Sequence, residues 1–208
     1  MTRDEFSDLL GMDVSHETFA QLEVFAGLVR KWGKAINLIA TSDHESIWFR
    51  HILDSAQLMR HVSTTPDKWV DIGTGGGFPG LVVAIMCADS FPATHFDFLE
   101  SDHRKASFLR EAVRVLGLKV TVHPERAEVT SALKANVASA RALAPLAQMI
   151  PLLNRHLAKD GVALLLKGKN HNIEIAEARK LWKFNVSIYE SITDCNAAVI
   201  RLSEVQRA

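Results

Sequence analysis

The residues of this chain best suited to chemistry lie in one glycine-rich turn. The stretch from Trp69 to Ala88 reads WVDIGTGGGFPGLVVAIMCA, with four glycines between positions 73 and 77. Glycine lacks a Cβ and permits positive φ, so a ligand can lie almost against the backbone. Pro79 presets the first turn of a helix. A short apolar strand, a bare turn and a helix N-terminus together predict a nucleotide-cofactor site at the carboxyl edge of a parallel sheet.

Two classes of cofactor use a turn of this kind. The G-x-G-x-x-G pattern of dinucleotide-binding proteins is matched by Gly75, Gly77 and Gly80. The D-x-G-x-G-x-G form used for S-adenosylmethionine is matched by Asp71, Gly73, Gly75 and Gly77. Because both patterns share Gly75 and Gly77, the turn alone leaves both cofactors open.

Acidic residues after the next two strands help to choose between them. Glu100 ends the second expected strand, where a carboxylate accepts hydrogen bonds from the ribose hydroxyls of either cofactor. Its alternative role is a charge at the start of the following helix. Glu128 follows the third strand and suits the adenine amino edge of S-adenosylmethionine; its alternative is a solvated helix-start charge. The chain ends at residue 208, which leaves little room for the second half of a dehydrogenase. We therefore favour S-adenosylmethionine.

The elements that must position these residues change character along the chain. Residues 1–65 are expected to be helical, with helices over 17–34 and 43–61 from apolar spacing near 3.6. Strands are then predicted at 68–73, 94–100, 119–123, 136–141 and 161–167, alternating with helices at 79–88, 102–116, 145–157 and 172–182. Two last extended runs, 184–192 and 197–203, predict an antiparallel hairpin.

This order predicts an α/β fold of the class I S-adenosylmethionine-dependent methyltransferases. Such a fold is Rossmann-like, with a seven-stranded, mostly parallel sheet whose last strand is antiparallel. We place an N-terminal helical extension at 1–66 and the methyltransferase domain at 67–208.

Composition limits the partners and the compartment. Lys and Arg together number 24, as do Asp and Glu, so the net charge is zero and bulk charge does not hold nucleic acid; a local basic patch stays open. Cys87 and Cys195 have no C-x-x-C spacing and are expected to be buried, reduced thiols. The first residues show no signal-peptide pattern, and the longest apolar run, 81–88, is too short to cross a bilayer. We expect a cytoplasmic monomer with no metal and no membrane contact.

Five stretches together resemble one known family. They are KAINLIA at 34–40, RHILDS at 50–55, VDIGTGGGFPG at 70–80, ESDHRKASFLR at 100–110 and SARALAPL at 139–146. Their combination is similar to the small-subunit ribosomal RNA methyltransferase G family, also called GidB. The resemblance implies methyl transfer from S-adenosylmethionine to N7 of a guanine in 16S rRNA, in the 530-loop region. The implied partner is 16S rRNA in the small ribosomal subunit or its precursor.

The resemblance also implies roles for particular residues. Gly73 and Phe78 would bind the donor at the turn, Ala127 and Glu128 its adenosine end, and Arg141 the donor as well. Together with the residues from pattern, the expected donor site comprises Asp71, Gly73, Gly75, Gly77, Phe78, Glu100, Ala127, Glu128 and Arg141. The family frequently has aspartate at the position of Glu100, and ribose bonding should survive the extra methylene.

We assign no catalytic base, and the expected substrate atom does not require one. Guanine N7 has a lone pair and no proton, so catalysis can rest on positioning and electrostatics. No Asn/Asp-Pro-Pro-aromatic motif and no Pro-Cys pair follow the fourth strand. We expect the RNA side of the pocket to be lined by Arg50, His51, Arg141 and Lys167. The alternatives are a methyltransferase of small molecules or proteins, an NAD-type oxidoreductase, and a binding module without catalysis.

Overall fold

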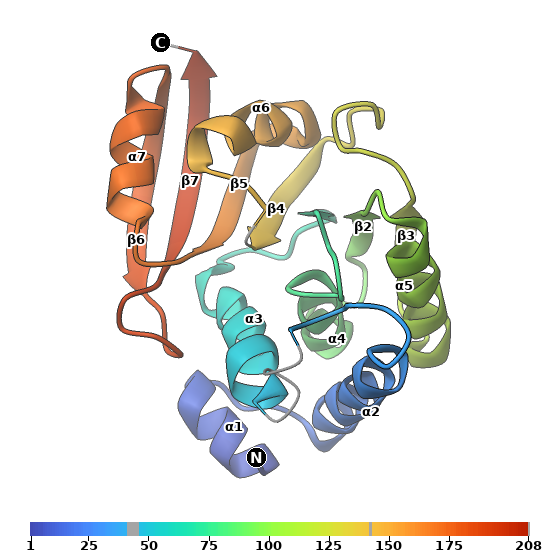
Figure 1. Ribbon diagram of the computed structural model, residues 1–208. Coiled ribbons are helices and arrows are strands. Elements are labelled where there is room, and N and C mark those ends of the chain that lie inside the picture. Colours follow the sequence, from blue (N-terminus) through green and yellow to red (C-terminus); the bar gives the residue numbers. More distant parts are fainter. Residues whose placement is uncertain (41–45, 142, 208) are drawn as a thin grey trace.

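The computed structural model describes residues 1–40, 46–141 and 143–207, and its centre is a seven-stranded sheet (Figure 1). The strands are β1 (Lys68–Ile72), β2 (His95–Leu99), β3 (Val120–His123), β4 (Ala135–Arg141), β5 (Leu157–Lys167), β6 (Trp182–Glu190) and β7 (Ala198–Arg207). Their order across the sheet is β3-β2-β1-β4-β5-β7-β6. β1 to β5 pair in parallel, and β7 runs antiparallel to both of its neighbours. This confirms the predicted fold class.

Helices cover both faces of this sheet. They are α1 (Arg3–Leu10), α2 (His16–Trp32), α3 (Asp54–Ala56), α4 (Gly80–Ser90), α5 (His103–Leu116), α6 (Leu146–His156) and α7 (His171–Arg179). Side chains alternate along β1, as a strand requires. Trp69 packs in the hydrophobic cluster that contains residues of α2, α4 and α5, whereas Val70 and Ile72 pack in the cluster of α6 and α7. In Figure 1, α6 and α7 accordingly lie at the top, away from α1 to α5.

The strand order reverses between β1 and β4, and this defines where a ligand can bind. From β1, one half of the sheet continues through β2 and β3, and the other through β4 and β5. The crossovers leave β1 and β4 in opposite directions, so the loops after these strands separate. The carboxyl ends of β1 and β4 are therefore the expected crevice of this fold.

The N-terminal helices share a core with the sheet. Phe6 of α1 and Phe25 of α2 are fully buried in one hydrophobic cluster with Trp69 of β1. Ser15 caps α2 as a side-chain acceptor from the Thr18 amide at 3.0 Å. This packing holds the N-terminal segment on one side of the sheet. The division at residues 66 and 67 stays a prediction.

Two predicted elements need correction. The expected helix 43–61 is not one regular helix: residues 43–45 lie outside the described residues, and a π-helical turn Trp48–Leu53, α3 and a 3-10 helix Gln57–His61 follow. Apolar spacing predicts burial but does not distinguish these helix types. The strand predicted at 161–167 begins earlier, since β5 starts at Leu157, which pairs with Ala135. Of the two cysteines expected to be buried, Cys87 is buried, whereas Cys195 is exposed because it lies in the loop between β6 and β7.

Candidate functional site

The glycine turn after β1 has the conformation that the sequence predicts. Gly73, Gly75 and Gly77 have φ values of +71°, +58° and +93°. A Cβ on Gly73 would lie 2.6 Å from Cδ1 of Leu143, so Gly73 is needed for close packing. A Cβ on Gly75 would meet only the Gly73 carbonyl oxygen, at 3.8 Å. Open space beside Gly75 thus leaves its backbone accessible to a donor.

Buried Asp71 stabilises this turn through hydrogen bonds. Its Oδ2 accepts from the Gly80 amide at 3.1 Å, and its Oδ1 accepts from the Ser139 hydroxyl at 2.5 Å. Ser139 in turn accepts from Trp69 Nε1 at 2.8 Å. Burial raises the pKa of Asp71 from 3.8 to about 6, although these hydrogen bonds favour the ionised form. The visible contacts of Asp71 are internal, and its contact with a donor stays a prediction.

Glu100 lies beside the turn at the end of β2. Its Oε2 accepts from the Gly75 amide at 2.8 Å, and its Oε1 accepts from the Asp102 amide at 2.7 Å. The capping of α5 is done by Asp102, which accepts from the amides of residues 104 and 105. Each carboxylate oxygen has a second lone pair. Glu100 therefore holds the turn and retains acceptor capacity for ribose hydroxyls.

The loop after β3 brings Ala127 and Glu128 to the same sheet edge. β3 pairs in parallel with β2, so the loops after both strands leave from one edge. Ala127 is buried, Glu128 is exposed, and the Ala127 carbonyl accepts from His156 Nε2 at 2.8 Å. Burial lowers the pKa of His156, which favours the neutral ring. His156 is a supporting residue that sequence reasoning missed, because only packing brings α6 to this loop.

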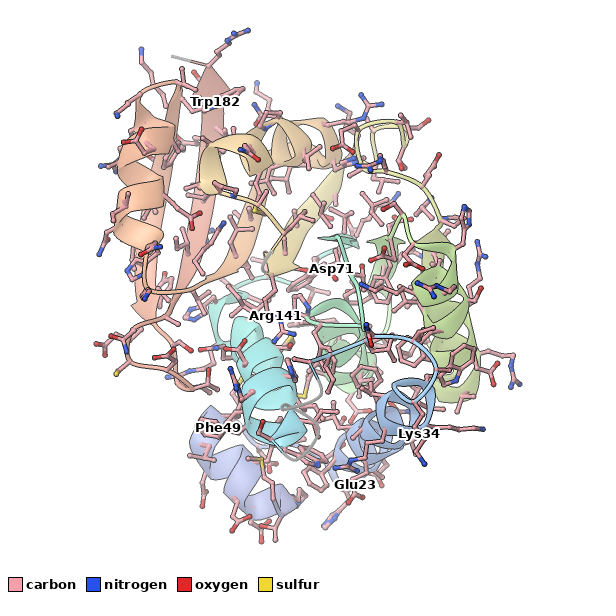
Figure 2. The ribbon with its side chains drawn as sticks, in the orientation of Figure 1. Glu23, Lys34, Phe49, Asp71, Arg141 and Trp182 are labelled. Carbon is pink, nitrogen blue, oxygen red and sulfur yellow. The ribbon has the colours of Figure 1, made fainter. Side chains whose placement is uncertain are left out.

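Arg141 joins the glycine turn to the N-terminal segment. Its Nη2 donates to His51 Nδ1 at 2.8 Å, and its Nη1 donates to the Arg50 carbonyl oxygen at 3.1 Å and to Asp54 Oδ2 at 3.4 Å. The guanidinium carbon lies 5.3 Å from the centroid of the Phe78 ring, and the His51 ring lies 5.0 Å from it. Figure 2 shows Arg141 and Asp71 near the centre of the molecule. Arg50, His51, Phe78 and Arg141, all singled out from sequence, meet here.

Arg141 also lines a large cavity. Its volume is about 1170 Å³, and it lies between the π-helical turn, the segment after β4, the end of β5 and the β6–β7 loop. The four residues expected on the RNA side, Arg50, His51, Arg141 and Lys167, all line it. The structure therefore brings together the residues proposed for substrate. Their contact with RNA stays a prediction.

Lys167 lines the cavity, but its ammonium is bound by other groups of the protein. Its side chain is only 7% exposed. Its ammonium donates to the Ala144 carbonyl oxygen at 2.7 Å and to Glu174 Oε2 at 2.8 Å. Glu174 was not a candidate from sequence, since a lone glutamate on a helix gives no distinguishing signal.

Asp54 is a second residue that sequence reasoning passed over. Besides Arg141, it binds Gln57 Nε2 at 2.8 Å and the Thr193 hydroxyl at 2.7 Å through Oδ1. It thereby connects the N-terminal segment to the β6–β7 loop. The signal was present, because Asp54 belongs to the RHILDS stretch at 50–55.

Two kinds of site are not seen in the described part of the chain. Within residues 1–40, 46–141 and 143–207, no group of three or more His, Cys, Asp or Glu side chains could hold a metal ion. The same residues contain no helix long and apolar enough to span a membrane.

The architecture resembles solved methyltransferases. A SAM-dependent methyltransferase from Aquifex aeolicus matches 86% of this chain and 98% of its own, with a TM-score of 0.61 and 13% identity. TYW2 of M. jannaschii, solved in complex with AdoMet, matches 84% of this chain and 80% of its own, with a TM-score of 0.56 and 12% identity. The strand order and the glycine turn, with these likenesses, define the class I S-adenosylmethionine-dependent methyltransferase fold.

Sequence comparison gives the family. The family model for rRNA small subunit methyltransferase G, GidB, matches residues 18–203. Ribosomal RNA small subunit methyltransferase G of Cereibacter sphaeroides is 48% identical over 94% of this chain and 95% of its own length. The protein of that name from Ruegeria pomeroyi is 42% identical over 94% of this chain and 96% of its own. The chain belongs to this family, which confirms the resemblance and the methyl donor and rejects the oxidoreductase alternative.

Proposed function

We propose that this protein transfers a methyl group from S-adenosylmethionine to N7 of a guanine in 16S rRNA, in the 530-loop region. Its relatives are named as ribosomal RNA methyltransferases, which supports ribosomal RNA as the substrate. One structural observation supports the proposal: Arg141 lies over the ring of Phe78 in the glycine turn and also lines a cavity of about 1170 Å³. A donor at the turn and a base in the cavity would thus be neighbours.

The donor site would be formed by residues around the turn. Gly73, Gly75 and Gly77 would let it approach the backbone, Glu100 would accept from its ribose, and Ala127 and Glu128 would flank its adenine. Asp71 would hold the turn in shape, while Phe78 and Arg141 would close its methionine side. When bound, S-adenosylmethionine supplies an electrophilic methyl group on a sulfonium.

The RNA site requires positioning and no general base. Guanine N7 uses its own lone pair for the new carbon–nitrogen bond, while the carbon–sulfur bond breaks and its electrons stay on sulfur. The purine gains a positive charge in this step. Arginine side chains are suited to donate to the neighbouring O6 atom, and Arg50 and Arg141 line the cavity together with His51 and Lys167.

The substrate particle is proposed to be the small ribosomal subunit or its precursor. The net charge of zero supports recognition of a structured particle over tight binding of naked RNA. We further propose that the protein acts as a monomer in the cytoplasm, where ribosomes assemble.

The test uses small subunits from cells that lack this protein. Purified protein and labelled S-adenosylmethionine are incubated with these subunits, with naked 16S rRNA, or with large subunits as a control. We expect label in 16S rRNA of the small subunit, mapped as N7-methylguanosine in the 530 loop. Absence of label from every RNA, or label at another atom, would overturn the proposal.

A further inference from the structure

The segment that follows β4 lies between the glycine turn and the cavity. Leu143, Ala144 and Pro145 line the cavity. The Leu143 side chain also packs on the turn, because its Cδ1 is 2.6 Å from where a Cβ of Gly73 would be. Residues 143–146 therefore contact both halves of the proposed site, and we call them the bridging segment.

One ion pair, in which Lys167 is buried and Glu174 is partly buried, holds the backbone of the bridging segment. The Lys167 ammonium, at the end of β5, donates to the Ala144 carbonyl oxygen at 2.7 Å. Glu174 Oε2, on α7, accepts from the Leu146 amide at 2.9 Å. Lys167 and Glu174 also bind each other, with 2.8 Å between Nζ and Oε2. Two charged side chains thus fix a carbonyl and an amide that lie two residues apart.

Glu174 supplies what the start of α6 lacks. The N-cap position of α6 is Pro145, which makes no side-chain capping bond. The first amides of a helix need acceptors, and a negative charge there also interacts favourably with the helix dipole. Glu174 meets both needs from another helix, so the start of α6 depends on α7.

Stability alone does not account for this pair, whose Lys167 and Glu174 side chains are only 7% and 25% exposed. Removing two charges from water is costly, and a well-packed apolar pair is often at least as stabilising. The pair instead fixes a geometry. The Lys167 ammonium, the Glu174 carboxylate, the Ala144 carbonyl and the Leu146 amide are held in one arrangement. Because α6 starts at this point, a shift of Ala144 or Leu146 would move the side chain of Leu143 on Gly73.

We propose that Lys167 and Glu174 are positioning residues, which set the bridging segment for the donor and for the target base. Lys167 then acts on methylation through the Ala144 carbonyl and not through a direct bond to an RNA phosphate. This rests on the proposed function for the RNA substrate. The donor part of the inference rests only on the methyltransferase fold.

The experiment compares four variants of the full chain. Lys167→Met and Glu174→Leu each break the pair, Lys167→Met/Glu174→Leu replaces it with an apolar pair, and Glu174→Gln keeps an acceptor oxygen. The matched control is the exposed pair Glu177–Lys180 on and just after α7, with 2.7 Å between its charged atoms, changed to Glu177→Leu and Lys180→Met. Lys169→Met controls for loss of an exposed charge near the cavity.

The readouts are the Kd for S-adenosylhomocysteine by calorimetry, the donor KM and kcat for small subunits, and thermal unfolding. We expect about tenfold weaker binding of S-adenosylhomocysteine for each single variant, as for a lost charged hydrogen bond. The double variant should lose no more than the worse single variant, since both changes break one unit. Glu174→Gln should recover part of the loss, and the controls should match the wild type.

Two results would overturn the inference. In the first, Glu174→Leu keeps wild-type donor affinity and methylation, whereas Lys167→Met is inactive. That result would make Lys167 a direct RNA contact. The other is full additivity in the double variant. If Lys167→Met fails to fold, the comparison of Glu174→Leu with Glu174→Gln decides the donor part. If wild-type protein labels no RNA, calorimetry still tests the pair, so the two failures can be told apart.

Discussion

The Arg141 guanidinium donates a 2.8 Å hydrogen bond to Nδ1 of His51, a residue 90 positions earlier in the chain. A guanidinium can only donate, so Nδ1 of His51 must carry the lone pair. The same guanidinium lies over the ring of Phe78 at 5.3 Å. The Arg141 side chain thus holds together the end of β4, the N-terminal segment and the glycine turn.

Replacement of Arg141 by lysine should separate charge from geometry. Arg141→Lys keeps the positive charge but loses the planar donor set that reaches His51, the Arg50 carbonyl and Asp54 at once. We expect kcat/KM for small subunits to fall by about tenfold or more, in line with one lost charged hydrogen bond. Arg114→Lys, on the exposed face of α5, is the matched control. Wild-type methylation by Arg141→Lys would show that the geometry is dispensable.

Glu100 should control donor affinity. In Glu100→Gln, one carboxylate oxygen becomes an amide donor and faces the amide of Gly75 or of Asp102. We expect about tenfold weaker binding of S-adenosylhomocysteine, since a buried amide loses its acceptor. Calorimetric titration measures this, with Glu111→Gln on the exposed face of α5 as the control. Equal affinities for the two variants would contradict the placement of Glu100 in the donor site.

Gly75 and Gly11 have similar backbone conformations. Alanine substitutions at both therefore distinguish an effect on donor binding from an effect of backbone strain. Gly75 and Gly11 have φ values of +58° and +69°, and a Cβ on either one meets nothing closer than 3.8 Å. Alanine at either position should cost about 1 kcal/mol of stability from the left-handed backbone. Only Gly75→Ala should also weaken S-adenosylhomocysteine binding, because its Cβ would enter the space beside the turn. Thermal unfolding and calorimetry on both variants check this, and equal donor affinity would place the donor elsewhere.

The pH dependence of stability should report the buried carboxyl of Asp71. Its pKa is about 6 in the folded protein and 3.8 when unperturbed, so the folded state binds more protons in this range. Stability from this group is therefore present at low pH and lost as the pH rises through about 6. Between about pH 7 and about pH 5, wild type should gain about 1 kcal/mol relative to Asp71→Asn.

Urea unfolding of both proteins at the two pH values measures this difference. The lowered pKa of His156 acts in the opposite direction, since protonation of its buried ring destabilises the fold as the pH falls. His156 is present in both proteins, so its contribution cancels in the comparison. A difference that does not change with pH would mean that Asp71 stays ionised throughout.

Much of the fold could be predicted because its signals are local. The alternation of short apolar strands with amphipathic helices gave the sheet, and the strand β1, the turn from Gly73 and the helix α4 follow one another within a few residues. Helix type was harder to predict. The segment from Trp48 to His61 is buried with helical spacing, yet its backbone passes through π-helical, α-helical and 3-10 geometry. That choice depends on packing against neighbours that are distant in sequence.

The sequence by itself determined the glycine turn, the parallel sheet, the family and the set of basic residues that line the cavity. Only the tertiary structure decided what these side chains do. It turns the ammonium of Lys167 inward to Ala144 and Glu174, buries Asp71 beneath the turn, and adds Asp54 and His156 as supports. The physical reason is that hydrogen bonds between residues tens of positions apart depend on strand order and helix packing. A periodicity of two or 3.6 residues carries no information about either.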